Sequence, residues 1–370
     1  MEKKTVAVVG ATGLAGQQFI AALEEHPWFQ MTALVSSKRS AGKKYGDAVK
    51  QANGSVGWWA GEFPSDKTQQ MVVQLSDDFD PESVDIVFTA TEIAPSPDQQ
   101  ARGETKQSLT QAIESRFATA RPTISTTSAF RYEDDVPIII PGVNSNHAPL
   151  LKKQADRGWK GFVMPIPNCT TTGLAVSLKP IYDKFGIDMV LMTSMQAMSG
   201  AGRTGGVLGL DILDNVIPFI AGEEEKVQKE TQKILGDYAD GAITPADLKI
   251  SCTCTRVNVQ DGHTEAVFVS TKDRCTVDAV KEAMREIGRE LTGLPSAPGE
   301  MIVIREDPFR PQPKIDRNAH DGMATVVGRV REDTALPNGI KYVLVSHNTK
   351  MGAAKGAVLV AEQLVQEGLI

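Results

Sequence analysis

Short apolar runs alternate with helical patterns along the first part of the chain. The β-branched run at 4–9 predicts a buried strand, and apolar residues at helical spacing follow through Phe19, Ile20 and Leu23. Further strands are predicted at 31–35, 71–75, 85–90, around Ile124 and at 137–140, and the polar stretch 99–118 favours a helix. Alternation of this kind predicts a doubly wound parallel sheet of the α/β class.

The pattern changes from about residue 161 onward. Strands with period-two or β-rich patterns are predicted at 161–164, 189–195, 248–256 and 263–270, with longer helices between them. Residues 352–367 predict a small-residue helix with a broad apolar face. This second part therefore fits a mixed sheet with helices on one face.

Composition narrows the class of protein. A chain of 370 residues is long for one core and suits two domains. The net charge of −7 argues against a nucleic-acid partner, although a local basic cluster can still bind an anionic substrate. No apolar run is long enough to cross a bilayer, and the N-terminus has no signal-peptide core. Since the four cysteines do not suggest a disulfide framework, we expect a reducing, cytoplasmic location.

A glycine-rich turn follows the first predicted strand and opens a helix. Glycines at this point let a backbone approach a pyrophosphate, and the helix N-terminus offers free N–H groups. An ordinary glycine-rich turn is the alternative interpretation. The predicted cofactor contacts here are Gly10, Thr12, Gly13, Leu14, Ala15 and Gly16.

The end of the second strand indicates which nicotinamide cofactor binds. Ser36, Ser37, Lys38 and Arg39 stand where a carboxylate would bind the ribose of NAD. Hydroxyls and cations suit a 2′-phosphate, so NADP is predicted, with a solvated basic turn as the alternative.

Cys169 lies at a predicted strand-to-helix junction. Asn168 precedes it and three threonines follow, which is unlike the surroundings of a small core residue. The N-terminus of a helix favours the thiolate form of such a cysteine. The sequence therefore predicts a nucleophile here, whereas Cys252, Cys254 and Cys275 are interpreted as structural, and no metal site is expected.

Arg256 and His263 lie far downstream in a strand–turn–strand pattern. The turn Asp261-Gly262 puts His263 at the start of a strand, where a neutral imidazole could exchange a proton with Cys169. Arg256 ends the preceding strand, and its planar fork suits a substrate carboxylate. A structural histidine and a surface salt bridge are the alternatives.

At these residues the chain resembles aspartate-semialdehyde dehydrogenases, in particular the archaeal and fungal branch. The resemblance covers nearly the whole chain. Its motifs are GATGLAGQQF at 10–19, VPIIIPGVN at 136–144, PNCTTTGL at 167–174, MQAMSGAG at 195–202, LDILDNVIPFIAGEEEK at 210–226, RVNVQDGHTE at 256–265, RPQPKIDR at 310–317 and SHNTKMGAAKGA at 346–357.

The resemblance implies an NADP-dependent reaction that interconverts 4-aspartyl phosphate with aspartate semialdehyde and phosphate, in lysine, threonine and methionine biosynthesis. It implies a dinucleotide-binding domain at 1–165 and 347–370, and a catalytic and dimerisation domain at 166–346. A homodimer or homotetramer is implied, with the apolar segment 208–220 as part of the contact or, alternatively, as a core helix.

The same resemblance implies a role for each site residue. Cys169 would be the nucleophile, with His263 as its acid/base. Gln196 would orient the reacting group, and Asn168 would support the thiol and the acyl oxygen. Arg256 would bind the α-carboxylate and Glu223 the α-amino group of the substrate. Phosphate would be held by Lys226 and Arg131, and the cofactor would also meet Gly200 and Asn348.

Two segments depart from the family pattern. Arg203-Thr204-Gly205-Gly206 replaces the usual residues after SGAG, and 91–121 is longer and more polar than usual. Either segment could alter substrate or cofactor contacts. The rival functions are an acyl-CoA reductase of the malonyl-CoA kind, an N-acetyl-amino-acid semialdehyde dehydrogenase and a non-catalytic NADP sensor. Glu223 argues against the first two, because neither substrate presents a free ammonium group.

Overall fold

The structure is a computed structural model, which describes residues 2–202 and 209–370. These residues form two compact units. The first comprises Met1–Pro137, Ala148–Ile166 and Ala357–Ile370, and the second comprises Ile138–His147 and Pro167–Gly356. The functional division at residues 165 and 347 stays a prediction.

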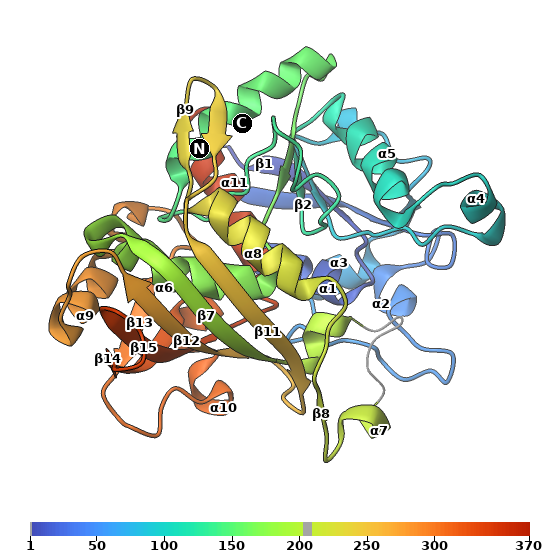
Figure 1. Cartoon of the computed structure of the whole chain (residues 1–370). Helices are drawn as coiled ribbons and strands as arrows, with labels where there is room; N and C mark the ends of the chain where they lie inside the picture. Colours follow the sequence, from blue (N-terminus) through green and yellow to red (C-terminus); the bar gives the residue numbers. More distant parts are fainter. Residues whose placement is uncertain (1, 203–208) are drawn as a thin grey trace. The chain divides into compact units, whose positions relative to one another are not determined.

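The first unit is built on a six-stranded parallel sheet in the order β3-β2-β1-β4-β5-β6. Two of its strands, β1 and β2, are labelled in Figure 1. Val6 to Val9 in β1 are fully buried, as expected for a central parallel strand with both faces covered. The strands are β1 (Lys4–Val9), β2 (Phe29–Ser36), β3 (Val73–Leu75), β4 (Ile86–Thr89), β5 (Thr123–Ser125) and β6 (Val163–Pro165). The helices are α1 (Leu14–Leu23), α2 (Tyr45–Ala48), α3 (Asp66–Gln70), α4 (Pro97–Ala101), α5 (Lys106–Ala118) and, from Ala357 onward, α11 (Ala354–Gln366).

The predicted helix at 99–118 is two helices. Ser96 is the N-cap of α4 and Thr105 is the N-cap of α5, each with a capping box that satisfies the first backbone N–H groups. Gly103 lies between them with φ of 78°, a left-handed conformation that ends the first helix. Capping chemistry, which hydrophobic spacing does not register, therefore divides this segment.

The strand predicted at 137–140 is wrong. Ile138, Ile139 and Ile140 are buried but pair with no strand among the described residues. The side chain of Asn144 takes the place of a neighbouring strand, because its Nδ2 donates to the carbonyl of Ile138 and its Oδ1 accepts from the N–H of Ile140. This apolar run is therefore a buried segment whose backbone groups are hydrogen-bonded to a side chain instead of to a neighbouring strand.

The second unit contains a seven-stranded mixed sheet in the order β13-β14-β15-β12-β7-β11-β8, formed by the described residues. Its strands are β7 (Ile187–Gln196), β8 (Val216–Ile217), β11 (Lys249–Val257), β12 (His263–Thr271), β13 (Ile302–Arg305), β14 (Thr325–Asp333) and β15 (Gly339–Ser346). A separate hairpin joins β9 (Asp237–Ala239) and β10 (Ala242–Thr244). The parallel sheet of the first unit and this mixed sheet confirm the predicted fold class.

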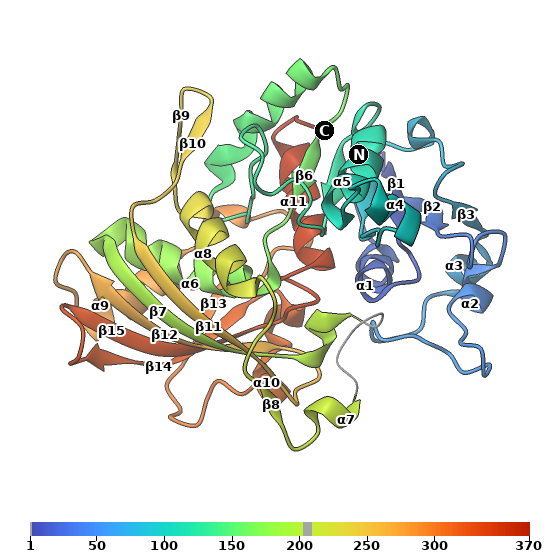
Figure 2. The same cartoon turned by 45° about the vertical axis from the view of Figure 1, so that its right-hand side comes forward.

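Helices cover one face of the mixed sheet. α6 (Cys169–Phe185), α8 (Glu223–Ile234) and α9 (Val277–Glu286) lie on the same side of it (Figure 2). The opposite face presents exposed residues at alternate positions, among them Leu191 and Thr193 in β7. Two short helices, α7 (Gly209–Ile212) and α10 (Pro313–Asp316), lie in the connections.

Strand directions bring three predicted site residues to one edge of this sheet. β7 and β11 run parallel, so that Gln196 and Arg256 pair at their carboxyl ends. β12 runs antiparallel to β7 and begins at His263, directly before the pair formed by Thr264 and Met195. The edge therefore collects an amide, a guanidinium and an imidazole.

Within the described residues, no helix combines the length and apolar character that crossing a membrane requires.

Candidate active site

Cys169 is the first residue of α6 and is partly exposed. Asn168 caps this helix, because its Oδ1 accepts hydrogen bonds from the N–H groups of Thr170 at 2.9 Å and Thr171 at 3.2 Å. The positive end of the helix dipole favours a thiolate at this position. By contrast, Cys252 and Cys254 are buried, and burial raises the pKa of both thiols.

His263 lies against the thiol. Its Nε2 is 3.1 Å from the Sγ of Cys169, and its ring is completely buried. Burial, reinforced by the positive charges of Arg256 and His347, lowers the pKa of His263 to about 3. The imidazole is therefore neutral at physiological pH.

A backbone contact determines which nitrogen of His263 carries the proton. The N–H of Ala197 donates to Nδ1 at 3.0 Å, so Nδ1 must be unprotonated. The single proton of the neutral ring then lies on Nε2 and faces Cys169. This tautomer donates to a thiolate or to an oxygen on the reacting carbon, and it favours the acid half of the predicted acid/base role.

Arg256 lies at the same edge and is buried. Its Nη1 donates to the carbonyl of Ala197 at 2.8 Å, so one residue holds both the guanidinium and the imidazole. Burial lowers the pKa of Arg256, and the neighbouring Cys169 and Glu223 act in the opposite direction. Gln196 is also buried, and its Nε2 donates to the hydroxyl of Ser194 at 3.1 Å.

Two buried carboxylates from α8 meet the residues around the thiol. Glu223 accepts from the side-chain amide of Asn168 at 2.9 Å and from the hydroxyl of Thr170 at 3.4 Å. Glu230, which is fully buried, accepts from the backbone N–H of Asn168 at 2.6 Å. The start of α6 is thus held by acceptors from a neighbouring helix.

The two predicted phosphate ligands lie in different units. Lys226 is half-buried and lies one turn after Glu223 on α8. Arg131 belongs to the first unit, where it is buried and its Nη2 donates to the carbonyl of Thr126 at 3.1 Å.

Asn348 and Gly200, which were predicted as cofactor contacts, lie among the site residues of the second unit. The Oδ1 of Asn348 accepts from the N–H of Gly262 at 2.8 Å, and its Nδ2 donates to the hydroxyl of Ser199 at 2.8 Å. A Cβ on Gly200 would lie 3.0 Å from Nη1 of Arg256 and 3.1 Å from Cε1 of His263.

The predicted dinucleotide contacts gather in the first unit. Gly13 is the N-cap of α1, whose helix begins at Leu14 and continues through Ala15. A Cβ on Gly16 would overlap the carbonyl oxygen of Gly10, so a glycine is required for this close packing of helix on turn.

The residues at the end of β2 lie beside this turn. The hydroxyls of Thr12 and Ser36 are 3.1 Å apart, and Ser37, Lys38 and Arg39 are exposed just beyond. Their hydroxyls and cations are therefore accessible to an anionic ligand.

Comparisons with known proteins agree with this geometry. The family model for the semialdehyde dehydrogenase NAD binding domain matches residues 5–150, and that for the semialdehyde dehydrogenase dimerisation domain matches 178–351. Aspartate-semialdehyde dehydrogenase of Methanothermobacter thermautotrophicus is 44% identical over 96% of this chain and 97% of its own length. That of Saccharomyces cerevisiae is 41% identical over 100% and 99%.

The chain belongs to the aspartate-semialdehyde dehydrogenase family. Among solved structures, the aspartate-semialdehyde dehydrogenase of Candida albicans with NADP is similar, with a TM-score of 0.83 and 37% identity over 100% of both chains. The aspartate semialdehyde dehydrogenase II of Vibrio cholerae has a TM-score of 0.73 and 27% identity, with 99% of each chain covered.

Sequence reasoning missed some residues that hold this family's site together. Glu230 shares the buried stripe of α8 with Val227 and Ile234, and an acid within such a stripe was the available signal. Ala197 left no signal, because its contacts are made by its backbone N–H and carbonyl. Ser199 left none either, because the partner of its hydroxyl is Asn348, 149 residues further along the chain. The departure at 203–206 lies outside the described residues.

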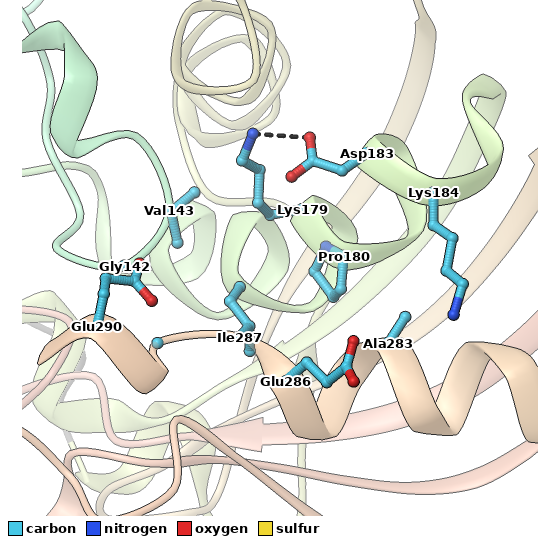
Figure 3. A pocket seen from close by; sticks show the side chains of 11 residues that line it. Gly142, Val143, Lys179, Pro180, Asp183, Lys184, Ala283, Glu286, Ile287 and Glu290 are labelled. Atoms are coloured by element: carbon cyan, nitrogen blue, oxygen red, sulfur yellow. Dashed lines mark hydrogen bonds and ion pairs between the residues drawn. The ribbon is translucent and has the colours of Figure 1, made fainter.

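A cavity of about 350 Å³ lies elsewhere in the second unit (Figure 3). It is bordered by Lys179 and Lys184 from α6 and by Glu286 from α9, and Lys179 is paired with Asp183 at 2.7 Å. None of the predicted site residues lines it. Its mixed charges favour no class of ligand, so it does not compete with the site at Cys169.

Proposed function

We propose that this chain is an NADP-dependent aspartate-semialdehyde dehydrogenase, which interconverts 4-aspartyl phosphate with aspartate semialdehyde and phosphate. The observation that carries the proposal is the 3.1 Å contact between Sγ of Cys169 and Nε2 of a neutral His263, at the first residue of a helix. A thiolate so placed can form a thioester, which divides acyl reduction into two easier steps.

In the biosynthetic direction, the thiolate of Cys169 attacks the acyl carbon of aspartyl phosphate. The carbon–sulfur bond forms, the carbon–oxygen bond to phosphate breaks, and phosphate leaves. The N–H of His263 stabilises negative charge on sulfur before the attack, and again when the carbon–sulfur bond of the reduced intermediate breaks and the aldehyde leaves. NADPH, when bound, supplies the hydride that this reduction needs.

Substrate recognition follows from the charges around the thiol. Arg256 has a buried guanidinium at the edge of the sheet, which suits the α-carboxylate of the substrate. Glu223 is buried beside Asn168 and Thr170, and it suits the α-ammonium group. Gln196 would orient the acyl group, and Asn168 would hold the first turn of α6.

Phosphate would be held by Lys226 and Arg131. A cation is needed for this purpose, because the leaving group is a dianion that gains charge as the thioester forms. Lys226 lies on the same face of α8 as Glu223, so this one helix would bind both the ammonium group and the phosphate group of the substrate.

NADP would be held by the first unit. The turn formed by Gly10, Thr12, Gly13 and Gly16 leaves N–H groups of α1 available to the pyrophosphate. Ser37, Lys38 and Arg39 are exposed where the 2′-phosphate of NADP would lie, and no carboxylate precedes them in β2 to repel it.

We infer a homodimer, and a homotetramer as the larger assembly. The family model that matches the second unit is that of a dimerisation domain. The sheet face opposite α6 carries exposed Leu191, and the 209–220 segment exposes Leu210, Val216 and Phe219. Burying such apolar groups would stabilise the assembly. The four free cysteines fit the reducing cytoplasm, where a catalytic thiol persists.

The assay that tests this proposal is reduction of NADP⁺ with aspartate semialdehyde, with and without phosphate, beside oxidation of NADPH with malonyl-CoA. Phosphate-dependent turnover of the semialdehyde is expected, and NAD⁺ should be used poorly. Turnover of malonyl-CoA alone would refute the substrate assignment while leaving the thioester chemistry intact.

A further inference from the structure

The proton position on His263 depends on how two loops are held together. One loop, 197–201, supplies the N–H of Ala197 that occupies Nδ1. The other, 258–262, leads into β12 and so places His263 itself. Two backbone hydrogen bonds join these loops, from the N–H of Met198 to the carbonyl of Val259 at 2.8 Å and from the N–H of Ser199 to the carbonyl of Gln260 at 3.1 Å. Where the loops shift relative to each other, the Ala197 contact lengthens and the proton is less strongly confined to one ring nitrogen.

Asn348 bridges these two loops with one side-chain amide. Its Oδ1 accepts from Gly262, the residue directly before His263, and its Nδ2 donates to the hydroxyl of Ser199, two residues after Ala197. Both bonds are 2.8 Å long, and Asn348 is buried. Because the bridge reaches each loop close to a partner of the Ala197–His263 bond, it restricts the length of that bond.

The same segment also reaches the nucleophile. A Cβ on Gly352 would lie 2.9 Å from the carbonyl oxygen of Asn348 and 3.0 Å from Cβ of Cys169. The backbone that follows β15 therefore packs against Cys169 at Gly352, four residues after the amide that bridges the two loops.

We propose that Ser199 and Asn348 are positioning residues, which help keep the proton of His263 on Nε2 by adding a side-chain bridge to the backbone hydrogen bonds between loop 197–201 and loop 258–262. This inference rests on the proposed function only for the rate it affects, since the tautomer is a property of the protein without substrate. Ser199 acts through Asn348 and Ala197, and its hydroxyl does not itself enter the reaction.

Ser199 is the informative position to change, because Asn348 is also a predicted cofactor contact. Removing one hydrogen bond in Ser199→Ala should lower kcat about tenfold and leave the KM for NADP⁺ within about twofold. In spectra of protein labelled with ¹⁵N-histidine, His263 of the unaltered chain should be protonated at Nε2. Ser199→Ala should add a population protonated at Nδ1.

Two further variants separate positioning from general stability. Ser199→Thr keeps the hydroxyl and should restore both kcat and the Nε2 tautomer. Ser270→Ala is the matched control, because Ser270 lies at the far end of β12 and its hydroxyl donates to the carbonyl of Pro337 at 2.7 Å. It should change the melting temperature without moving the His263 signals, which are assigned by their loss in His263→Gln.

The outcomes are distinct for the two proposals. An unchanged His263 spectrum in Ser199→Ala, or the same change in Ser270→Ala, would overturn the positioning role even if the enzyme turns over aspartate semialdehyde. A shifted tautomer in a protein that does not turn over this substrate would support the positioning role and refute the proposed function instead.

Discussion

Gly200→Ala tests how tightly two side chains are held in place: His263, the proposed acid, and Arg256, the proposed ligand of the substrate carboxylate. The added methyl group would lie 3.0 Å from Nη1 of Arg256, 3.1 Å from Cε1 of His263 and 3.3 Å from its Nε2. These distances are shorter than ordinary van der Waals contact, so the guanidinium or the ring must move by a few tenths of an ångström. Both side chains are buried and hydrogen-bonded to Ala197, and neither can move without lengthening that bond.

The size of the effect follows from this displacement. A misplacement of about 1 Å in an active site can cost about 100-fold in rate. A shift of a few tenths of an ångström should therefore lower kcat/KM for aspartate semialdehyde about tenfold, equivalent to about 1.4 kcal/mol. The free energy of unfolding should fall by about 1 kcal/mol, because the methyl group crowds two buried side chains although Gly200 itself is exposed and has no positive φ.

Steady-state kinetics and thermal melting measure the two quantities. Gly209→Ala is the matched control, since Gly209 is exposed and a Cβ there meets no atom of the described residues within 4 Å. It should leave kcat/KM unchanged, because the added methyl group touches neither His263 nor Arg256. An unchanged kcat/KM in Gly200→Ala would refute the steric reasoning, and a rise confined to the KM for NADP⁺ would return Gly200 to its predicted role as a cofactor contact.

Three further changes test other parts of the site. Cys169→Ser removes the nucleophile and should lower kcat by roughly 1,000-fold or more, while NADP⁺ binding measured by fluorescence titration should be retained. Retained activity would remove Cys169 from the mechanism. Arg256→Lys should raise the KM for the semialdehyde about tenfold or more, because an ammonium cannot replace the two-pronged contact, and an unchanged KM would assign Arg256 to structure. Glu265 is fully buried, neither carboxyl oxygen has a hydrogen-bond partner within the described residues, and burial raises its pKa well above 4.5. As pH rises, the carboxyl of Glu265 loses its proton in the unfolded chain before it does so in the folded protein. The free energy of unfolding should therefore fall above about pH 4.5, by up to about 1.4 kcal/mol per pH unit. Denaturant titrations of Glu265→Gln should lack this dependence on pH, and an identical dependence would show that Glu265 is ionised in the folded protein.

Local patterns along the chain were sufficient for the elements that carry the site. The helix after Cys169 was predictable, because an Asn cap and a helical repeat of apolar residues both act within a few residues of each other. The start of β12 at His263 followed in the same way from the turn Asp261-Gly262. The pattern also predicted the strands of the parallel sheet and the β7, β11 and β12 strands of the mixed sheet, since alternating and continuous apolar runs report which faces of a strand are buried. It grouped the strand at 161–164 with the mixed sheet, whereas β6 pairs with β5 in the parallel sheet.

Pairing between distant segments was beyond those patterns. The run at 137–140 has the composition of a strand, yet the amide of Asn144 occupies its backbone groups, and composition does not report that choice. In the same way, nothing in the local sequence of β12 indicates that the carboxyl of Glu265 has no hydrogen-bond partner within the described residues. Both outcomes depend on what packs against the segment.

The tertiary structure alone decided how the site works. Cys169 and His263 are 94 residues apart in the chain, and their 3.1 Å contact exists because α6 packs on the sheet at the edge where β12 begins. The tautomer of His263 is determined by one backbone N–H of Ala197, a group that every residue except proline possesses. The sequence by itself determined which side chains were available for the chemistry, because helix caps and turns are local. The direction in which the imidazole presents its proton was left to packing, because hydrogen bonds between loops depend on where the chain brings them together.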